Sequence, residues 1–348
     1  MSPHLRSLKS LLTLCWILGG SATFGSHFGS GFGNKFETHR VDSHAPIGVM
    51  GDHVHLGGEF MLSYRYMFME MDGLRDGTDT LTPAQVLTQF PVTPVRMTMQ
   101  MHMVGLMYAP TDRLTLMAML PYRILEMDHV TGMGGFFTTE SEGIGDLKLS
   151  GIYKLTEFDG GQLLLNFGFS APTGSIDEMD ATPAAPSGTI LPYPMQQGSG
   201  TFDAMPGITY NGQSAAWSWG GQLMGTFRLG ENDRDYQLGN RYEGTVWLAR
   251  AVSEWLSFSA RTRYQYQGNI DGADPALNPM MVPTADPDLR AFSRLDMLFG
   301  VNFLAPKSLG VFSGHRLAVE GGLPVYQRLD GPQLEIDYLI TVGWQKAF

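Results

Sequence analysis

The chain has 348 residues, of which 43% are hydrophobic and 16% charged, and its formal net charge is −11. This negative balance and the absence of any basic cluster exclude nucleic acid and an anionic membrane surface as electrostatic partners. Beyond residue 22 the sequence contains no run of about 18 apolar residues, so no α-helix of this chain is expected to span a bilayer.

The first 22 residues have the pattern of a secretory signal. Arg6 and Lys9 precede an apolar run over residues 11–18, and small residues follow it up to Ala22. We expect cleavage after Ala22, which removes two cations and takes the net charge from −11 to −13. The single cysteine, Cys15, lies in this segment, so the mature chain is expected to hold no disulfide and no thiolate metal site.

Residues 23–56 are rich in His and Gly and precede the first predicted strand, and we assign them to a periplasmic or plug segment. His53 and His55 lie on the same side of an extended chain, close enough to bind one ion. Neutral imidazole suits copper, nickel and zinc, and His44 and Met50 could add to such a copper site. The alternative is a solvated tail without a ligand.

From residue 57 to 348 the sequence predicts an all-β fold: a transmembrane, antiparallel, up-and-down β-barrel of about 12 strands. Apolar and polar residues alternate with a period of two. A chain that crosses lipid without helices must close its sheet, because every backbone amide has to be paired. The predicted strands cover 57–72, 95–109, 113–128, 144–156, 162–174, 200–211, 215–229, 236–251, 255–269, 291–304, 315–328 and 334–348.

The lengths of the connections between these strands distinguish the periplasmic end of the predicted barrel from its extracellular end. Short turns alternate with long connections rich in Gly, Pro and Asp, as the periplasmic turns and extracellular loops of such barrels do. The long connections are 73–94, 129–143, 175–199 and 270–290.

The last predicted strand ends on an aromatic residue, Phe348. Every second residue from Phe348 back to Ile336 is apolar except Lys346. This pattern resembles the closing strand of bacterial outer-membrane barrels, whose terminal aromatic is read by the assembly machinery. We therefore expect the bacterial outer membrane as the location after signal cleavage, with lipid, lipopolysaccharide and the barrel-assembly machinery as partners.

The face opposite to the apolar one carries charges of both signs and is expected to line the lumen. These charges either pair across the lumen and hold the barrel rigid, or they form the walls of a water-filled pathway. The charged residues assigned to the lumen are Arg65, Arg123, Asp146, Lys148, Arg241, Glu243, Arg261 and Arg263.

Methionine is crowded into the first third of the predicted barrel. Of 22 Met, 14 fall between Met50 and Met133. In the first and third strands the methionines stand at alternate positions with Arg65 and Arg123, so they are expected to point into the lumen with them. In the second strand the sequence does not decide which face the methionines occupy, and we favour the lumen. Thioethers select soft ions such as Cu(I) and pack adaptably against apolar ligands, or they simply fill space. The predicted thioether face consists of Met61, Met67, Met69, Met99, Met101 and Met117.

Several short segments resemble the MetA-pathway phenol-degradation family of outer-membrane barrels, a group often called simply transporters. They are Gly143 to Leu149, Tyr153 to Leu155, Pro172 to Gly174 and Gly198 to Thr201. The resemblance covers residues 57–348. It implies an outer-membrane barrel that passes small hydrophobic or aromatic compounds, and it supplies no catalytic residues.

Three functional hypotheses follow. The first is a passive transporter or channel for a small, hydrophobic or aromatic solute. The alternative is a copper-handling barrel, in which the His-rich segment captures the ion and the thioether face accepts it. The third is a structural or adhesin barrel that acts through its outer loops. No Ser/His/Asp set is marked by spacing, so we predict no enzyme activity.

Overall fold

The computed structural model describes residues 36–348. The predicted signal segment 1–22 lies outside the described residues, and so does the predicted segment 23–56 up to residue 35. Among the described residues, no helix is long and apolar enough to cross a membrane.

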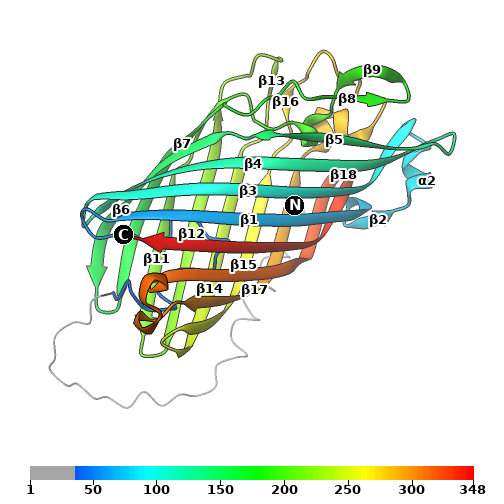
Figure 1. The fold of residues 1–348 in the computed structure, drawn as a ribbon. Coiled ribbons are helices and arrows are strands. Elements are labelled where there is room, and N and C mark those ends of the chain that lie inside the picture. The colour runs from blue at the N-terminus through cyan, green and yellow to red at the C-terminus, as the bar shows by residue number, and fades with distance from the viewer. Residues whose placement is uncertain (1–35) are drawn as a thin grey trace, which may run out of the picture. The chain divides into compact units, whose positions relative to one another are not determined.

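The described chain forms a closed antiparallel ring in which each strand pairs with its two neighbours (Figure 1). The ring is closed where β1 pairs with β18. The strands of the ring are β1 (Phe60–Gly77), β3 (Val92–Thr111), β4 (Leu114–Thr131), β6 (Leu147–Phe158), β7 (Gly161–Ala171), β11 (Gly207–Ser214), β12 (Trp217–Leu229), β14 (Arg241–Ser253), β15 (Leu256–Gln267), β17 (Phe292–Leu304) and β18 (His315–Ala347).

The long element β18 contains two crossings. Residues Arg316 to Leu329 pair with β17, whereas residues Leu334 to Ala347 pair with β1. The chain turns back between them at Gly331, whose φ of +77° favours glycine. The eleven labelled strands of the described ring therefore make twelve crossings, and the prediction of an up-and-down barrel of about 12 strands is confirmed.

Smaller elements lie in the connections and at one end of the ring. Two of them extend barrel strands: β5 (Phe136–Ile144) pairs with β4, and β10 (Phe202–Ala204) pairs with β7 and β12. The others are β2 (Asp79–Leu81), α2 (Pro83–Val86), β8 (Met179–Thr182), β9 (Ala185–Ile190), η3 (Tyr193–Met195), β13 (Tyr236–Gln237), β16 (Asp271–Gly272), η4 (Pro283–Ala285), η5 (Pro287–Leu289) and η6 (Lys307–Phe312).

Three details of the sequence prediction were wrong. Residues 129–143 are not all loop, because β5 continues the sheet beside the C-terminal half of β4. The predicted strand 200–211 is divided at Pro206, which cannot donate to a ladder, into β10 and β11. Residues 236–240 leave the barrel, and Tyr236 and Gln237 pair with β16 instead.

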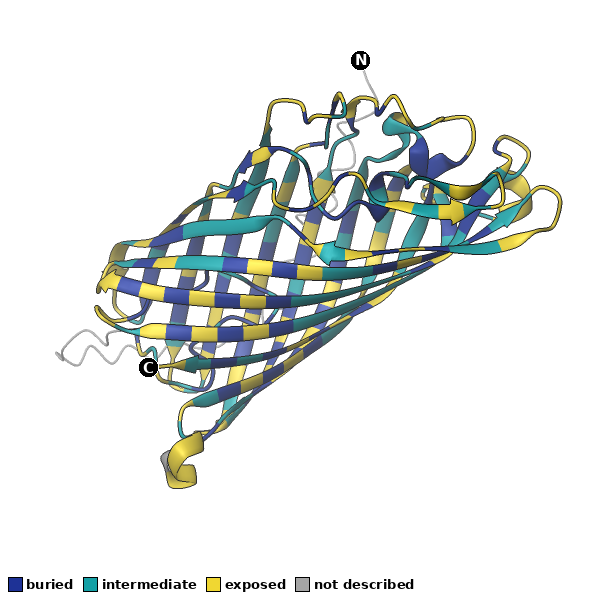
Figure 2. Cartoon of the chain, turned by 45° about the horizontal axis from the view of Figure 1, so that its top comes forward, coloured by how far each residue is buried: buried dark blue, intermediate teal, exposed yellow. Residues whose placement is uncertain are grey.

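Burial alternates along the barrel strands, so buried and exposed residues follow each other in bands (Figure 2). The strands are long: β3 has 20 residues, whereas a tilted strand needs roughly 9–11 to cross the hydrocarbon. The barrel thus extends beyond the membrane at the end opposite to Phe60 and Phe348. There the outward residues become polar, as in the hydrogen bond from Arg96 Nε to Glu70 Oε1 (2.8 Å).

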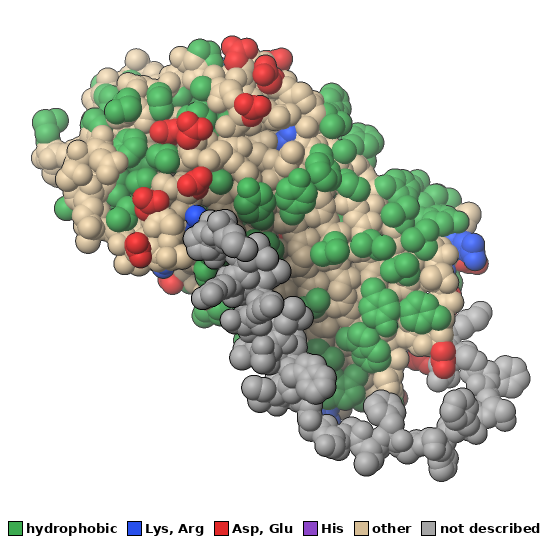
Figure 3. Space-filling model, turned by 180° about the vertical axis from the view of Figure 1, so that it is seen from behind, with side chains coloured by type: hydrophobic (Ala, Val, Ile, Leu, Met, Phe, Trp, Pro, Cys, Tyr) green, Lys and Arg blue, Asp and Glu red, His purple; other side chains and the backbone are tan. Residues whose placement is uncertain are grey.

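Hydrophobic side chains gather in patches on the face of the outer wall that Figure 3 shows. Large apolar side chains of alternate positions are exposed on neighbouring strands, for example Leu62, Leu106 and Leu116. This surface is suited to contact with lipid.

Candidate functional site

Residues 36–56, here called the lumenal segment, lie inside the barrel. They contain neither helix nor strand, yet most of them from Val41 to His55 are buried. Inward side chains of β7, β11, β12 and, across the ring, β18 donate hydrogen bonds to the backbone carbonyls of this segment, which is possible only if the segment lies within the lumen. The pairs are Ser218 to Asp42 (2.6 Å), Gln222 to Met50 (2.8 Å), Asn166 to Gly51 (2.6 Å), Asn211 to Asp52 (2.5 Å) and Arg316 to Val41 (2.7 Å).

Apolar contacts fix the same segment on two sides. Val54 packs in a cluster with side chains of β1, β3, β6 and β7, among them Met61 and Ile152. Ala45 and Val49 pack against Trp247 of β14. The lumenal segment is therefore bound to the barrel wall by both polar and apolar contacts at the end where the short turns lie.

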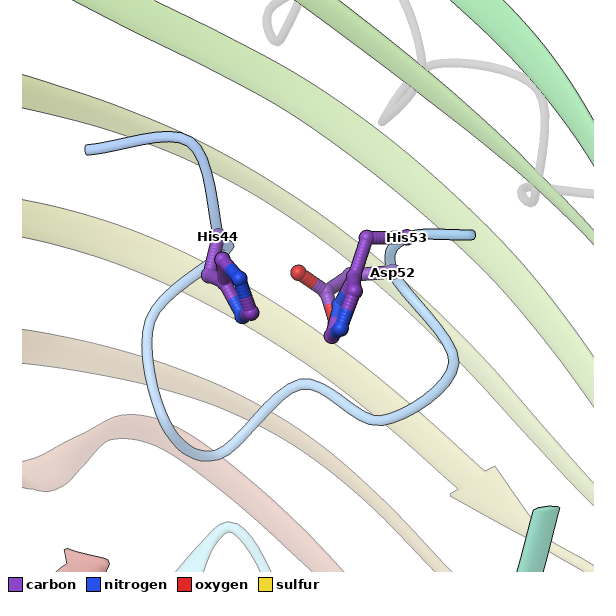
Figure 4. A group of neighbouring side chains, drawn as sticks. All are labelled: His44, Asp52 and His53. Atoms are coloured by element: carbon purple, nitrogen blue, oxygen red, sulfur yellow. The ribbon is translucent and has the colours of Figure 1, made fainter. Parts of the chain in front are cut away.

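Two turns of the lumenal segment bring its histidines together. The chain turns at Pro46, whose carbonyl accepts from Val49 N–H (2.9 Å), and again at Gly51, which has a φ of +68°. As a result His44 lies opposite Asp52 and His53 across the loop (Figure 4). The ligand atoms of these three residues all lie within 4.8 Å of one another.

His55 extends this group. Its Nε2 lies 3.3 Å from Nε2 of His53, and both residues are buried, with 7% and 4% exposure. A carboxylate faces the other nitrogen of each ring: Asp52 Oδ1 is 2.8 Å from His53 Nδ1, and Glu59 Oε2 is 3.3 Å from His55 Nδ1. Met50, which the sequence placed in the same site, contacts β12 through its carbonyl oxygen.

The electrostatic surroundings hold these groups in defined protonation states. Burial, followed by the positive charge of Arg316, keeps the pKa of His44 well below its usual value. Burial and then His53 lower the pKa of His55 to about 3. Burial opposes ionisation of Asp52, but the adjacent His53 and the N–H of Ala45 outweigh it, so the carboxyl pKa is lowered. At neutral pH, therefore, His44 and His55 are neutral and Asp52 is ionised.

The predicted thioether face lies on three adjacent strands. The odd-numbered residues of β1 and β3 are paired, including Met67 with Met101 and Met69 with Met99, and β3 continues the row into β4 through Met107 and Met117. Exposed Val104, Leu106 and Tyr108 occupy the opposite face of β3. The methionines of β3 thus point into the lumen.

This methionine face has two different environments. Near the short turns, Met61 and Met117 pack around Val54 of the lumenal segment. Near the long loops, Met99 packs in a second cluster whose buried members include Met97, Met127 and Met195. The half-buried Met67, Met69 and Met101 lie between these clusters.

A cavity of about 180 Å³ lies at the loop end of the methionine face. Two outer loops fold into the barrel to cover it: η3 contributes Pro194, and η4 contributes Thr284. The residues that line it are Met71, Met97, Met127, Pro194, Thr284, Arg290, Phe292, Arg294, Gln327, Leu329, Gln333, Leu334 and Ile336. A groove of about 490 Å³ on the outer wall includes the exposed side chains of Ile208, Leu223 and Val246. It faces lipid, so the lumenal cavity is the candidate solute site.

Charged side chains occupy the other side of the lumen. Arg261 of β15 forms two hydrogen bonds of 2.8 Å with Glu320 of β18, and both side chains are 1% exposed. Arg263 and Arg294 both pair with Asp296 of β17 (2.7 and 2.8 Å).

The remaining charged residues assigned from the sequence have distinct places. Arg241 and Glu243 of β14 are 3.7 Å apart, and Arg65 is buried on β1. Lys148 of β6 pairs in register with Met119, a buried residue of β4.

Arg123 and Asp146 hold the outer loop that covers the cavity. Arg123 donates to the carbonyl of Gln196 (2.8 Å), and Asp146 accepts from the backbone N–H of Ser199 (2.8 Å). Phe348 lies exposed beside β1, and its backbone exchanges two hydrogen bonds with Phe60 (2.7 and 3.2 Å).

Sequence reasoning missed the residues that orient or cover these sites. Asp52 and Glu59 face the histidine rings, but the sequence alone did not pair these acids with individual rings. The covering residues Leu191, Tyr193 and Met195 are buried although they belong to a predicted outer loop. Their apolar character within an otherwise polar loop was the available signal.

The sequence matches no protein-family profile and no curated protein. Among solved structures, the chain is similar to an outer membrane channel from Pseudomonas putida F1, with 16% identity and a TM-score of 0.59 over 85% of this chain and 97% of that one. It also aligns with the P. putida toluene transporter TodX, with 10% identity and a TM-score of 0.41 over 88% of this chain and 94% of that one. The first likeness establishes the fold. This chain has the fold of a bacterial outer-membrane barrel.

Proposed function

We propose that this protein is a passive outer-membrane channel for small apolar solutes with the size of a single aromatic ring. The observation that carries the proposal is the 180 Å³ cavity on the methionine face. A cavity of about 150 Å³ lined by apolar side chains is enough to bind benzene. Methionine suits such a role because its unbranched thioether adapts to ligands of different shape.

The polar edge of the cavity favours a ring that carries a hydroxyl group. Arg290 Nη2 donates to Gln333 Oε1 (3.1 Å), while Arg290 Nη1 is buried without a hydrogen-bond partner among the described residues. Phenol could place its ring against the methionines and its oxygen near this guanidinium. The resemblance to the phenol-degradation family supports a solute of this class.

The lumenal segment acts, in this proposal, as a plug between the cavity and the periplasm. It is anchored to inward side chains from most of the ring. A solute that reaches the cavity under the outer loops must pass this segment to leave at the other end. The proposal places the barrel in the outer membrane after removal of residues 1–22, in contact with lipid and lipopolysaccharide, with Phe348 presented to the assembly machinery.

Filling the cavity tests the proposal. Met71→Trp adds a bulky ring to the cavity wall on β1, and Leu62→Trp adds the same ring to the lipid-facing side of the same strand. We expect phenol or toluene uptake into proteoliposomes to fall at least ~10-fold in Met71→Trp, a loss that corresponds to a rise of about 1.4 kcal/mol in the barrier to transport. Leu62→Trp should transport at the wild-type rate. Equal uptake by both variants would show that solutes do not use the cavity.

A further inference from the structure

The two imidazole rings of His53 and His55 face each other with both Nε2 atoms 3.3 Å apart. In each ring the opposite nitrogen faces a carboxylate, Asp52 for His53 and Glu59 for His55. A carboxylate in this position accepts the Nδ1 proton, which leaves the Nε2 atom with a free lone pair. Two such lone pairs pointing at each other in a buried site repel, unless a proton or a metal cation lies between them.

The separation of the two nitrogens fits a metal ion as that cation. Nitrogen ligands lie about 2.0–2.1 Å from zinc in a tetrahedral site. Two ligands at the tetrahedral angle are then roughly 3.4 Å apart, close to the observed 3.3 Å. A hydrogen-bonded carboxylate behind each ligating imidazole is also the usual arrangement of metal-binding histidines in proteins.

A third donor is available on the opposite arm of the loop. The ring of His44 lies 3.9 Å from that of His53, measured between centroids. Its Nδ1 is buried and has no hydrogen-bond partner among the described residues. Figure 4 shows His44 and His53 facing each other across the loop. The ligand atoms of His44, Asp52 and His53 lie within 4.8 Å of one another, and His55 is not in this set. His44 therefore joins His53 and His55 around one ion only if its arm of the loop moves toward the two Nε2 atoms.

We propose that His53, His55 and His44 bind one divalent transition-metal ion inside the barrel, with Asp52 and Glu59 orienting the first two rings. Neutral imidazoles select copper, nickel or zinc. Hard ions such as Ca²⁺ and Mg²⁺ require several oxygen ligands. The guanidinium groups of Arg65 and Arg316 oppose every cation at this site electrostatically, so the selection among ions comes from the imidazole donors.

The ion would join the two arms of the lumenal segment. His44 precedes the turn at Pro46, whereas His53 and His55 follow the turn at Gly51. A ligand that binds only the folded position of this segment inside the barrel stabilises that position by RT ln(1 + [L]/Kd). If the segment is a plug, as proposed above, the metal ion is expected to hold it in place.

Calorimetric titration of the purified mature barrel with CuCl₂ and with ZnCl₂ tests the site directly. We expect one ion per chain for the wild type and at least a 10-fold weaker affinity for His53→Ala and for His55→Ala. His39→Ala is the matched control, because His39 is an exposed histidine of the same segment. Heat-modifiable gel migration of every variant confirms that the barrel is folded.

The positioning role of Asp52 has its own test. We expect Asp52→Asn to weaken metal affinity by about 10–100-fold, while the electron paramagnetic resonance spectrum of bound Cu²⁺ retains its nitrogen hyperfine lines. His53→Ala should remove one nitrogen from that pattern.

Two outcomes would overturn the metal site. One is equal affinity of the wild type and the His53→Ala/His55→Ala double variant; the other is an equal loss in His39→Ala. These measurements need no transport. Failure of the metal site is therefore distinguishable from failure of the channel proposal, which depends on solute uptake by Met71→Trp.

Discussion

The two sides of the lumen are filled by different kinds of inward side chain. On β1, β3 and β4 the inward positions are largely methionine, and their contacts are apolar. On β14, β15, β17 and β18 they include Arg, Asp, Glu and Gln, which form ion pairs and hydrogen bonds. The cavity lies between the two sides: Met71, Met97 and Met127 line one part of its wall, and residues of β17 and β18 line another. The ion pairs of the charged side connect neighbouring strands to each other.

This difference has an energetic cause. A buried ion pair is stable only when every charge keeps its partner, because an isolated buried charge loses its hydration without compensation. The charged side is therefore rigid and intolerant of single changes. A thioether carries no such requirement and can repack against a solute. We infer that the ion pairs of the charged side maintain the shape of the barrel, while the methionines form the adaptable part of the cavity wall.

The largest effect is expected at the buried pair of the charged side. Arg261→Met should cost about 3–5 kcal/mol of unfolding free energy, because it leaves Glu320 buried without a partner. The double variant Arg261→Met/Glu320→Met should recover most of this loss. Urea unfolding in detergent micelles, followed by tryptophan fluorescence, measures both. Equal stability of the single and double variants would contradict the assigned role of the pair.

Arg96→Met is the control for that measurement. Arg96 pairs with Glu70 on the outer surface, and its side chain is 46% exposed. Exposed pairs contribute little because solvent screens them. We expect no resolvable change in the unfolding curve.

A smaller effect is expected on the methionine side. Met127 is 1% exposed and belongs to the cluster around the cavity. Met127→Ala should cost about 2–4 kcal/mol, whereas the nearly isosteric Met127→Leu should cost less than about 1.5 kcal/mol. The same unfolding assay applies. A Leu variant as unstable as the Arg261→Met variant would remove the distinction between the two sides.

The lumenal segment touches both sides and gives the third prediction. A Cβ atom at Gly48 would lie 2.3 Å from both Arg261 Nη2 and Glu320 Oε2. Overpacking of this kind costs about 1–3 kcal/mol, and we expect Gly48→Ala to loosen the segment and raise single-channel conductance in planar bilayers. Deletion of residues 23–55 should raise it further.

Gly132→Ala is the matched control for conductance, because the nearest atom to its added Cβ is 3.8 Å away in an outer loop. It should behave as the wild type. Wild-type conductance in both the Gly48→Ala variant and the deletion variant would mean that the lumenal segment does not obstruct the pathway.

Local pattern was sufficient for much of this fold. Side chains of a strand point alternately to opposite faces, so the inward or outward facing of Leu62, Arg65 and Met117 follows from sequence spacing alone. The same alternation, together with turn composition, located the twelve crossings within a few residues. It failed where the pattern was interrupted, as at Pro206, or where a loop continued the sheet above the membrane, as in β5.

Only the tertiary structure decided which residues meet. Arg261 and Glu320 are 59 positions apart, and their pairing depends on the register of β15, β17 and β18. The position of the lumenal segment depends on closure of the whole ring, and no local sequence pattern predicts that closure. The cavity exists because two distant loops fold over the methionines, and His44 joins His53 because Gly51 turns the chain back. The face to which a strand side chain points follows from the two-residue period of the backbone. Contacts across the lumen depend instead on strand register, ring closure and loop packing in three dimensions.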